Sequence, residues 1–141
     1  MSEKEIDRKV AIILAADVVN YSKHMEVDES ETVKNLRACE LILQKTIKKH
    51  DGRLFNTGGD SFFIEFPSAV EAVECAVAFQ NELKKRNTSD NITIPLEFRI
   101  GISMGDVIKE KENLLGDGVN IAARLEAIAQ TNGITISKNI Y

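Results

Sequence analysis

The feature that most restricts the possible folds is a short apolar run at residues 9–16 that ends in a single carboxylate, Asp17. The run reads KVAIILAA, with two adjacent isoleucines near its centre. Short runs with β-branched residues in the middle are typical of buried strands. The sequence therefore predicts a strand inside a sheet, with an acidic side chain at the point where that strand ends.

Three helices are predicted from apolar residues that recur at helical spacing. The first begins near Asp28 and ends at Gly52. The second begins at Ser68–Glu71, which matches a capping box. The third runs from near Asp117 to Gly133, and its inward residues are expected to be Ile121, Ala122, Leu125 and Ile128.

Five further strands are predicted, at residues 53–55, 61–66, 96–104, 107–108 and 134–136. The first two form a hairpin around the turn Thr57–Asp60, where two glycines permit positive φ angles. Gly105–Asp106 is expected to turn the chain between the third of these strands and the fourth. Residues 84–91 are expected to form a solvated loop.

The order strand, helix, strand, strand, helix, strand predicts an α+β fold, a ferredoxin-like βαββαβ sandwich with its helices on one face of the sheet. One domain is expected over residues 1–141, with residues 1–8 as a polar N-terminal extension. A chain of 141 residues is long enough to bury a core of its own.

Composition excludes several classes of protein. A net charge of −4 and a pI near 5.3 argue against broad binding to nucleic acid, which needs a basic surface. No apolar run approaches the roughly 20 residues of a membrane helix, so no direct membrane contact is expected in this segment. Cys39 and Cys75 lack metal-ligand spacing, and so do His24 and His50. We expect a cytoplasmic location, with both thiols reduced.

Two acids are candidates for a metal site. In a ferredoxin-like core the strand that ends at Asp17 and the hairpin that carries Asp60 are neighbours, so the two carboxylates can come together. They repel one another unless a cation neutralises them, and their oxygen atoms suit Mg²⁺ or Mn²⁺. Taken singly, each acid has an ordinary alternative, Asp17 as a strand-end cap and Asp60 as a turn residue.

Three further features suit a phosphorylated ligand. Asn120 and Arg124 lie four residues apart and share one face of the third helix. Arg99 lies on the polar side of its strand, and a guanidinium group matches the geometry of phosphate. The turn Val18–Ser22 could direct backbone N–H groups at phosphate oxygens. The alternatives are a polar helix face, a solvated arginine and a plain turn, but together the features indicate chemistry on a nucleoside triphosphate.

Four blocks of this sequence resemble the catalytic domain of the class III nucleotidyl cyclases, which make cyclic AMP or cyclic GMP. They occur in the family's order and span nearly the whole chain. The last block is the most specific. The blocks are Leu14–Ser22, Phe55–Asp60, Phe98–Gly105 and Leu115–Leu125.

The resemblance implies a role for each matching residue. Asp17 and Asp60 would hold two Mg²⁺ or Mn²⁺ ions, with help from the carbonyl of Val18. Asn120 would orient the ribose, and Arg124 would stabilise charge on the α-phosphoryl group as the 3′-hydroxyl attacks and pyrophosphate leaves. In the family the acids and the Asn/Arg pair of one site come from different subunits, which implies a homodimer with shared active sites. The triphosphate would be bound by Val19, Asn20, Tyr21, Ser22 and Arg99.

Two positions leave the choice of base open. Where the family's adenylate cyclases often have Lys and Asp, this chain has Asn56 and Asn113. An amide can both donate and accept, so it can match either purine. ATP is the expected substrate, and the expected activity is that of an adenylate cyclase, a phosphorus–oxygen lyase. The family's domain continues past the position of Tyr141, so a C-terminal truncation is expected.

Other functions remain open. A cyclase-like domain with weak or no activity would bind nucleotide or dimerise for regulation, and the two asparagines motivate this alternative. Gly58–Phe62 resembles the Gly-Gly-Asp-Glu-Phe signature of diguanylate cyclases, although Ser61 replaces the second acid. Guanylate cyclase activity is the third alternative.

Overall fold

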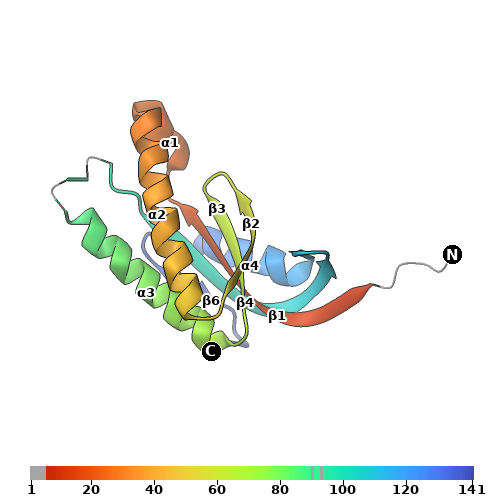
Figure 1. The fold of residues 1–141 in the computed structure, drawn as a ribbon. Helices are drawn as coiled ribbons and strands as arrows, with labels where there is room; N and C mark the ends of the chain where they lie inside the picture. The colour runs from red at the N-terminus through yellow and green to blue at the C-terminus, as the bar shows by residue number, and fades with distance from the viewer. Residues whose placement is uncertain (1–5, 90, 93) are drawn as a thin grey trace.

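A computed structural model describes residues 6–89, 91, 92 and 94–141. Its centre is a six-stranded sheet in the order β2-β3-β1-β4-β5, with β6 paired to β4 (Figure 1). The strands are β1 (Asp7–Val18), β2 (Arg53–Gly58), β3 (Ser61–Phe66), β4 (Phe98–Glu110), β5 (Asn113–Leu115) and β6 (Ile134–Ile136). The helices are α1 (Tyr21–Val27), α2 (Glu29–Lys49), α3 (Ala69–Asn87) and α4 (Asp117–Ile128).

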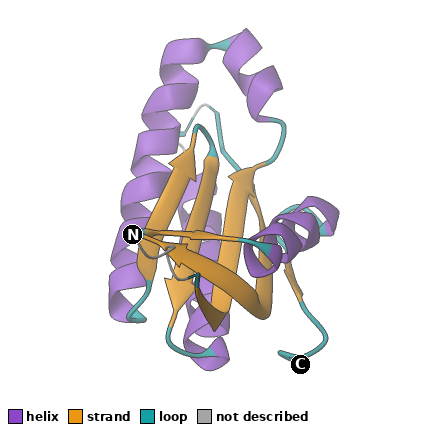
Figure 2. Ribbon diagram, turned by 90° about the vertical axis from the view of Figure 1, so that its right-hand side faces the viewer, coloured by secondary structure: helices purple, strands orange, loops and turns teal. Residues whose placement is uncertain are grey.

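Helices α2 and α3 pack together on one face of the sheet and cover the larger hydrophobic core (Figures 1 and 2). Both helices begin where predicted, and the side chains of Asp28 and Ser68 cap their N-termini by accepting hydrogen bonds from backbone N–H groups three residues further on. Cys39 and Cys75 are free and buried between these layers. Burial raises the pKa of Cys39 to about 11 and that of Cys75 to about 12, so both are protonated, unreactive core residues.

Strands β1 and β4 form the centre of the sheet. They pair in antiparallel register from Asp7 opposite Lys109 to Val18 opposite Phe98. The core order β2-β3-β1-β4 is that of the predicted ferredoxin-like sandwich. The predicted turn at Gly105–Asp106 is wrong, because both residues pair with β1 and β4 runs through them unbroken. Strand β1 begins at Asp7, so residues 7 and 8, which were expected to belong to the N-terminal extension, are part of the sheet.

The two helices of the predicted βαββαβ unit, α2 and α3, share one face of the sheet as expected, whereas α4, which follows that unit, lies on the opposite face (Figure 2). Strand β1 is apolar on both faces because successive residues enter different cores. Ile12, Leu14 and Ala16 face α2 and α3, whereas Ala11, Ile13 and Ala15 belong to the second, smaller core. The unbroken apolar sequence of residues 11–16 therefore reflects a strand that is covered on both sides.

The residues that α4 turns inward agree only in part with those expected. Ala122 is buried as predicted, Ile121 and Leu125 are half-buried, and the side chain of Ile128 is 74% exposed. Gly118 and Glu126, which were not expected to face inward, are buried. Small residues are required here because α4 lies very close to β4. Ser103 strengthens this contact, since its buried hydroxyl donates a 2.6 Å hydrogen bond to the carbonyl of Gly118.

Gly101→Ala should strongly destabilise the fold. A Cβ atom at this position of β4 would overlap the backbone nitrogen of Glu126 and the carbonyl oxygen of Ala122, and neither is free to move away. We expect the free energy of unfolding to fall by about 3 kcal/mol. Urea denaturation measures this loss. The matched control is Gly58→Ala, whose Cβ would have nothing within 4 Å, and a loss at Gly101 no larger than at Gly58 would contradict the close packing.

Several local elements were not predicted. The short helix α1 follows β1 directly, where only a turn was expected, and β5 forms a small antiparallel pair with the end of β4. Helix α3 continues to Asn87 and so takes up half of the predicted loop, while residue 90 lies outside the described residues. Helix α4 ends at Ile128, well before Gly133, because Ala129 is extended.

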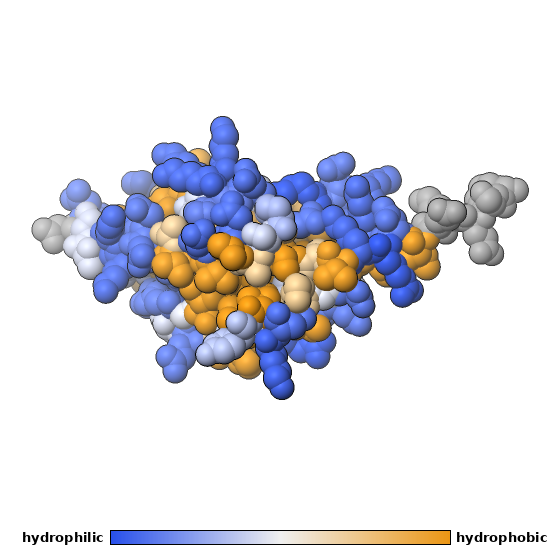
Figure 3. Space-filling view, turned by 90° about the horizontal axis from the view of Figure 1, so that it is seen from below, coloured by the Kyte–Doolittle hydropathy of each residue, from blue (hydrophilic) through white to orange (hydrophobic). Residues whose placement is uncertain are grey.

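The surface is not uniformly polar. Figure 3 shows apolar side chains gathered in the middle of the face that is seen from below. Large apolar side chains that remain exposed include those of Val10, Val27, Val70 and Ile128. Exposed apolar patches often mark contact surfaces. None of the helices in the described part of the chain is both long enough and apolar enough to cross a membrane.

Candidate active site

The two predicted metal-ligating acids meet at one end of the sheet. Asp17 is the last residue but one of β1 and lies opposite Ser61 of β3 and Arg99 of β4. Asp60 immediately precedes Ser61 in the β2–β3 turn, where Gly59 adopts a φ of 64°. Burial raises the pKa of Asp17, and the negative charge of Asp60 adds to the rise. The sheet register therefore brings the two carboxylates together, as predicted.

Arg99 is held in place by three groups. Its Nη2 atom lies 3.7 Å from Oδ1 of Asp17, and its Nε atom lies 3.5 Å from Oε2 of Glu126. Its Nη1 atom donates a 3.1 Å hydrogen bond to the carbonyl oxygen of Ala127. The alternative of a freely solvated arginine is therefore wrong. Three buried atoms of this cluster still have no hydrogen-bond partner among the described residues, namely Asp17 Oδ1, Arg99 Nε and Glu126 Oε2.

Glu126 is a carboxyl group in an unusual place. It lies on the buried face of α4 and is only 7% exposed. Burial raises its pKa to about 8, and the hydrogen bond that it donates to Asp17 and the negative charge of Asp17 contribute to the rise. At neutral pH Glu126 is therefore mostly protonated, and it shares its hydrogen with the Asp17 carboxylate.

The raised pKa of Glu126 predicts a pH-dependent stability. Because the folded protein holds this proton at a pH where the unfolded chain has released it, stability is complete below the ordinary pKa of 4.5 and is lost as the pH rises through about 8. Without divalent cations, the free energy of unfolding should fall between about pH 4.5 and pH 8. Glu126→Gln should flatten this slope in urea denaturation, and an equal slope in both proteins would contradict the assignment.

Sequence reasoning did not identify Glu126 or the Ala127 carbonyl. A signal was present, because Gly118, Ala122 and Glu126 recur every four residues on one helix face. Two small residues on this face indicate close packing, and a glutamate in line with them must be buried. The expected inward face, centred on Ile121 and Leu125, hid this pattern because it followed hydrophobicity alone.

Asn120 and Arg124 share one face of α4, as predicted, but not the face that carries Glu126. Both residues are exposed, and neither side chain forms a hydrogen bond or ion pair with any residue of the described ranges. The two α4 faces are about 10 Å apart across the helix. The single chain therefore brings Arg99 and Glu126 to the metal acids and leaves Asn120 and Arg124 facing solvent.

The segment predicted to bind the triphosphate joins β1 to α1. Val18 ends β1, and the N–H of Val19 already donates to the carbonyl oxygen of Glu97 at 2.8 Å. The Val19 amide is thus used by the protein itself. Asn20 adopts a left-handed conformation with a φ of 56°, and α1 begins at Tyr21, followed by Ser22. The backbone that could still receive phosphate is therefore Asn20–Ser22.

The two asparagines expected near the base lie on strands at opposite ends of the sheet order. Asn56 is exposed on β2, next to a register shift, and Asn113 begins β5. The two strands nevertheless approach one another, because Nη1 of Arg53 in β2 donates a 2.6 Å hydrogen bond to the carbonyl oxygen of Glu112. The side-chain oxygen of Asn113 accepts from the N–H of Leu114, which leaves its NH₂ group for a ligand.

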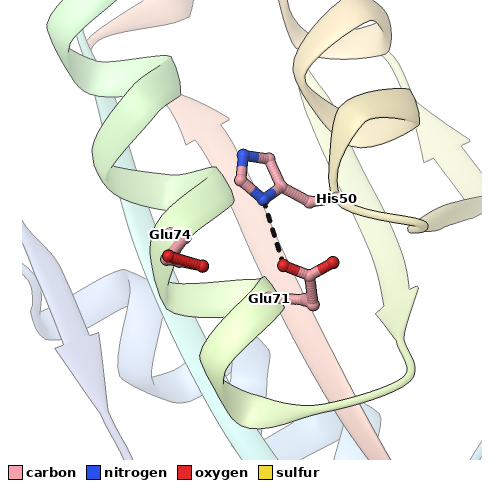
Figure 4. A group of neighbouring side chains, drawn as sticks. All are labelled: His50, Glu71 and Glu74. Atoms are coloured by element: carbon pink, nitrogen blue, oxygen red, sulfur yellow. Dashed lines mark hydrogen bonds and ion pairs between the residues drawn. The ribbon is translucent and has the colours of Figure 1, made fainter.

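A second group of possible metal ligands lies elsewhere. His50 at the end of α2 and Glu71 and Glu74 in α3 have ligand atoms within 4.8 Å of one another (Figure 4). Nδ1 of His50 lies 3.4 Å from Glu71, and this pairing accounts for their positions. The group contains none of the predicted site residues. A cavity of about 430 Å³ beside the C-terminal half of α3 and Asn132 is also lined by none of the predicted site residues.

Comparison with known proteins decides the family. The model of the family described as "Adenylate and Guanylate cyclase catalytic domain" matches residues 3–141. The chain belongs to this family. The resemblance seen in the four sequence blocks is therefore confirmed over the whole domain.

Curated relatives of this cyclase domain are longer proteins. "Putative adenylate cyclase 3" of Rhizobium meliloti is 42% identical over 142 residues, which cover 100% of this chain and 24% of the relative. An adenylate cyclase of Streptomyces coelicolor is 28% identical, over 95% of this chain and 34% of the relative. The chain thus spans between a quarter and a third of the length of these relatives.

Solved structures confirm the cyclase fold. An adenylate/guanylate cyclase/hydrolase from Silicibacter pomeroyi has a TM-score of 0.86 and 33% identity, covering 96% of this chain and 80% of that chain. The adenylyl cyclase CyaB from P. aeruginosa has a TM-score of 0.84 and 26% identity, covering 98% and 81%. The guanylyl cyclase Cya2 has a TM-score of 0.83 and 27% identity, covering 97% and 79%. Because both adenylyl and guanylyl cyclases are similar to it, the fold does not select the base.

Proposed function

We propose that this domain converts a nucleoside triphosphate, with ATP as the preferred substrate, to the 3′,5′-cyclic monophosphate with release of pyrophosphate. The observation that carries the proposal is the meeting of Asp17 and Asp60 at the end of the central strand. Family membership supports the same activity. Two carboxylates in a partly buried position have a clear chemical use in a protein that handles a highly anionic substrate.

The acids fit a divalent cation. Oδ1 of Asp17 is buried and has no hydrogen-bond partner among the described residues, and Asp60 adds a second negative charge beside it. Carboxylate oxygens of this kind suit Mg²⁺ or Mn²⁺. Asp17, Asp60 and the carbonyl of Val18 would hold two such ions, which neutralise the charge of the triphosphate and polarise its α-phosphoryl group.

The remaining residues bind and orient the nucleotide. Arg99 lies beside Asp17, where its guanidinium group can contact the triphosphate together with the backbone of Asn20–Ser22. Asn120 holds the ribose so that the 3′-oxygen lies in line with the α-phosphorus. As the 3′-oxygen bonds to this phosphorus, its bond to the pyrophosphate oxygen breaks, and Arg124 stabilises the charge that develops. Asn56 and Asn113 contact the base.

A homodimer completes the site in this proposal. Asn120 and Arg124 point away from the acids of their own chain, on the exposed face of α4. A second copy related by two-fold symmetry can supply this pair to the acids of the first and receive the same in return. Two composite sites then form, each with the acids of one protomer and the Asn/Arg pair of the other.

The product of the reaction tests the proposal. The full-length protein is incubated with Mn²⁺ and either ATP or GTP, and the nucleotides are separated and identified by mass. We expect cyclic AMP from ATP, with less cyclic GMP from GTP. No cyclic product from either nucleotide would favour a regulatory, catalytically silent domain. Cyclic di-GMP would instead assign the domain to diguanylate synthesis.

A further inference from the structure

Arg99 receives most of its anchoring from α4 rather than from the sheet. Its own strand neighbour Asp17 is the more distant of its two acidic partners, at 3.7 Å, and Glu126 lies at 3.5 Å. The carbonyl oxygen of Ala127, the next residue of α4, accepts a 3.1 Å hydrogen bond from Nη1 of Arg99. Two of the three contacts therefore come from consecutive residues at the end of one helix.

The backbone that carries Glu126 is fixed in position. A Cβ atom at Gly101 of β4 would overlap the backbone nitrogen of Glu126, so helix and strand are in direct contact there. Gly101 is only two residues from Arg99 on the same strand. The Glu126 side chain is nearly fully buried, so it has few other conformations to adopt. The position of the Glu126 carboxyl group relative to Arg99 is therefore fixed by the direct contact between α4 and β4.

We infer that Glu126 is a positioning residue of the cyclase site: it holds the Arg99 guanidinium beside the metal acids from the helix side. This inference rests on the proposed function, in which Asp17 binds a cation and Arg99 binds the triphosphate. A cation at Asp17 removes the sheet-side partner of Arg99, and Glu126 then remains as its one acidic partner among the residues described. Without Glu126, Arg99 would pair with Asp17 alone and compete with the cation for it.

A double-mutant cycle on nucleotide binding tests the inference. The probe is 3′-deoxy-ATP with Mn²⁺, which cannot cyclise because it lacks the attacking hydroxyl, and its Kd is measured by calorimetry with the full-length protein. Glu126→Gln keeps the size of the side chain and replaces the carboxyl group that faces Nε of Arg99 with an amide, which cannot form an ion pair. We expect Glu126→Gln and Arg99→Ala each to weaken binding about 10-fold, as for loss of a charged contact. The double variant should bind no more weakly than Arg99→Ala alone.

Two further measurements separate positioning from a general loss of structure. With ATP, Glu126→Gln should raise KM more than it lowers kcat, because the group it positions binds the triphosphate before the reaction. The melting temperature should change little. Glu97→Gln is the matched control, since this exposed carboxylate lies two residues from Arg99 and accepts a hydrogen bond from Asn132 instead. It should bind the probe like the unmodified protein.

The outcomes distinguish this inference from the proposed function. Unchanged binding in Glu126→Gln, or multiplied losses in the double variant, would overturn the positioning role alone. Unchanged binding in Arg99→Ala would overturn both the triphosphate role of Arg99 and the inference built on it. Coupled losses in a protein that makes no cyclic product would support the positioning role while contradicting the proposed reaction.

Discussion

Asp17→Ala and Asn120→Ala should each abolish cyclic nucleotide formation, yet a mixture of the two proteins should regain part of it. Asp17 and Asn120 serve different halves of each composite site, so a heterodimer contains one doubly damaged site and one intact site. With random pairing, half of the dimers are heterodimers, and the mixture should show about one quarter of the unmodified activity. Each variant alone should lose at least about 10²-fold to 10³-fold in rate, because it lacks a metal ligand or the ribose contact.

A matched mixture provides the control for this result. Asp17→Ala and Asp60→Ala both damage the acid half of the site, so their heterodimer has no intact site and should remain inactive. Native mass spectrometry establishes that heterodimers form in both mixtures. If heterodimers of Asp17→Ala and Asn120→Ala form and no activity returns, the site is not shared in the way proposed.

Arg124→Ala should slow the reaction without weakening nucleotide binding. The exposed guanidinium group is assigned to the charge that develops on the α-phosphoryl group, which is greater in the transition state than in the bound substrate. We expect kcat to fall by about 10²-fold to 10³-fold, while the Kd for 3′-deoxy-ATP stays within about 2-fold. Single-turnover kinetics and calorimetry measure the two quantities separately.

Two other substitutions serve as comparisons in this experiment. Arg124→Lys keeps the positive charge but loses the planar fork, so it should recover only part of the rate. Arg37→Ala removes an exposed arginine that pairs with Glu40 on α2, on the far face of the sheet, and should have no effect on either quantity. If Arg124→Ala weakens binding and leaves kcat unchanged, Arg124 binds the ground state and its assigned role is wrong.

Local signals in the sequence were sufficient to predict where the candidate site residues of the sheet lie. The apolar run before Asp17, the Gly-Gly turn before Asp60 and the capping box at Ser68 each fix a boundary through short-range chemistry. Because strand order followed from the succession of elements, the meeting of the two acids could be predicted without coordinates. The sheet register shows that this prediction was correct.

Long-range packing could not be predicted in the same way. Gly105–Asp106 has the composition of a turn, but pairing with all of β1 keeps β4 extended through it. The position of α4 on the second sheet face depends on contact between Gly101 and the helix backbone, which hydrophobic periodicity does not register. Glu126 was missed for the same reason, because a glutamate in a helix is expected to be exposed to solvent unless that close packing is known.

Anomalous diffraction from crystals grown with Mn²⁺ and 3′-deoxy-ATP is the most direct test of the central claim that Asp17 and Asp60 form a divalent-cation site for nucleotide chemistry. The account predicts anomalous peaks between these two carboxylates, with the triphosphate beside Arg99 and with Asn120 and Arg124 of a second copy at the ribose and α-phosphate. Manganese bound only elsewhere, such as at His50, Glu71 and Glu74, with no peak between Asp17 and Asp60, would contradict it.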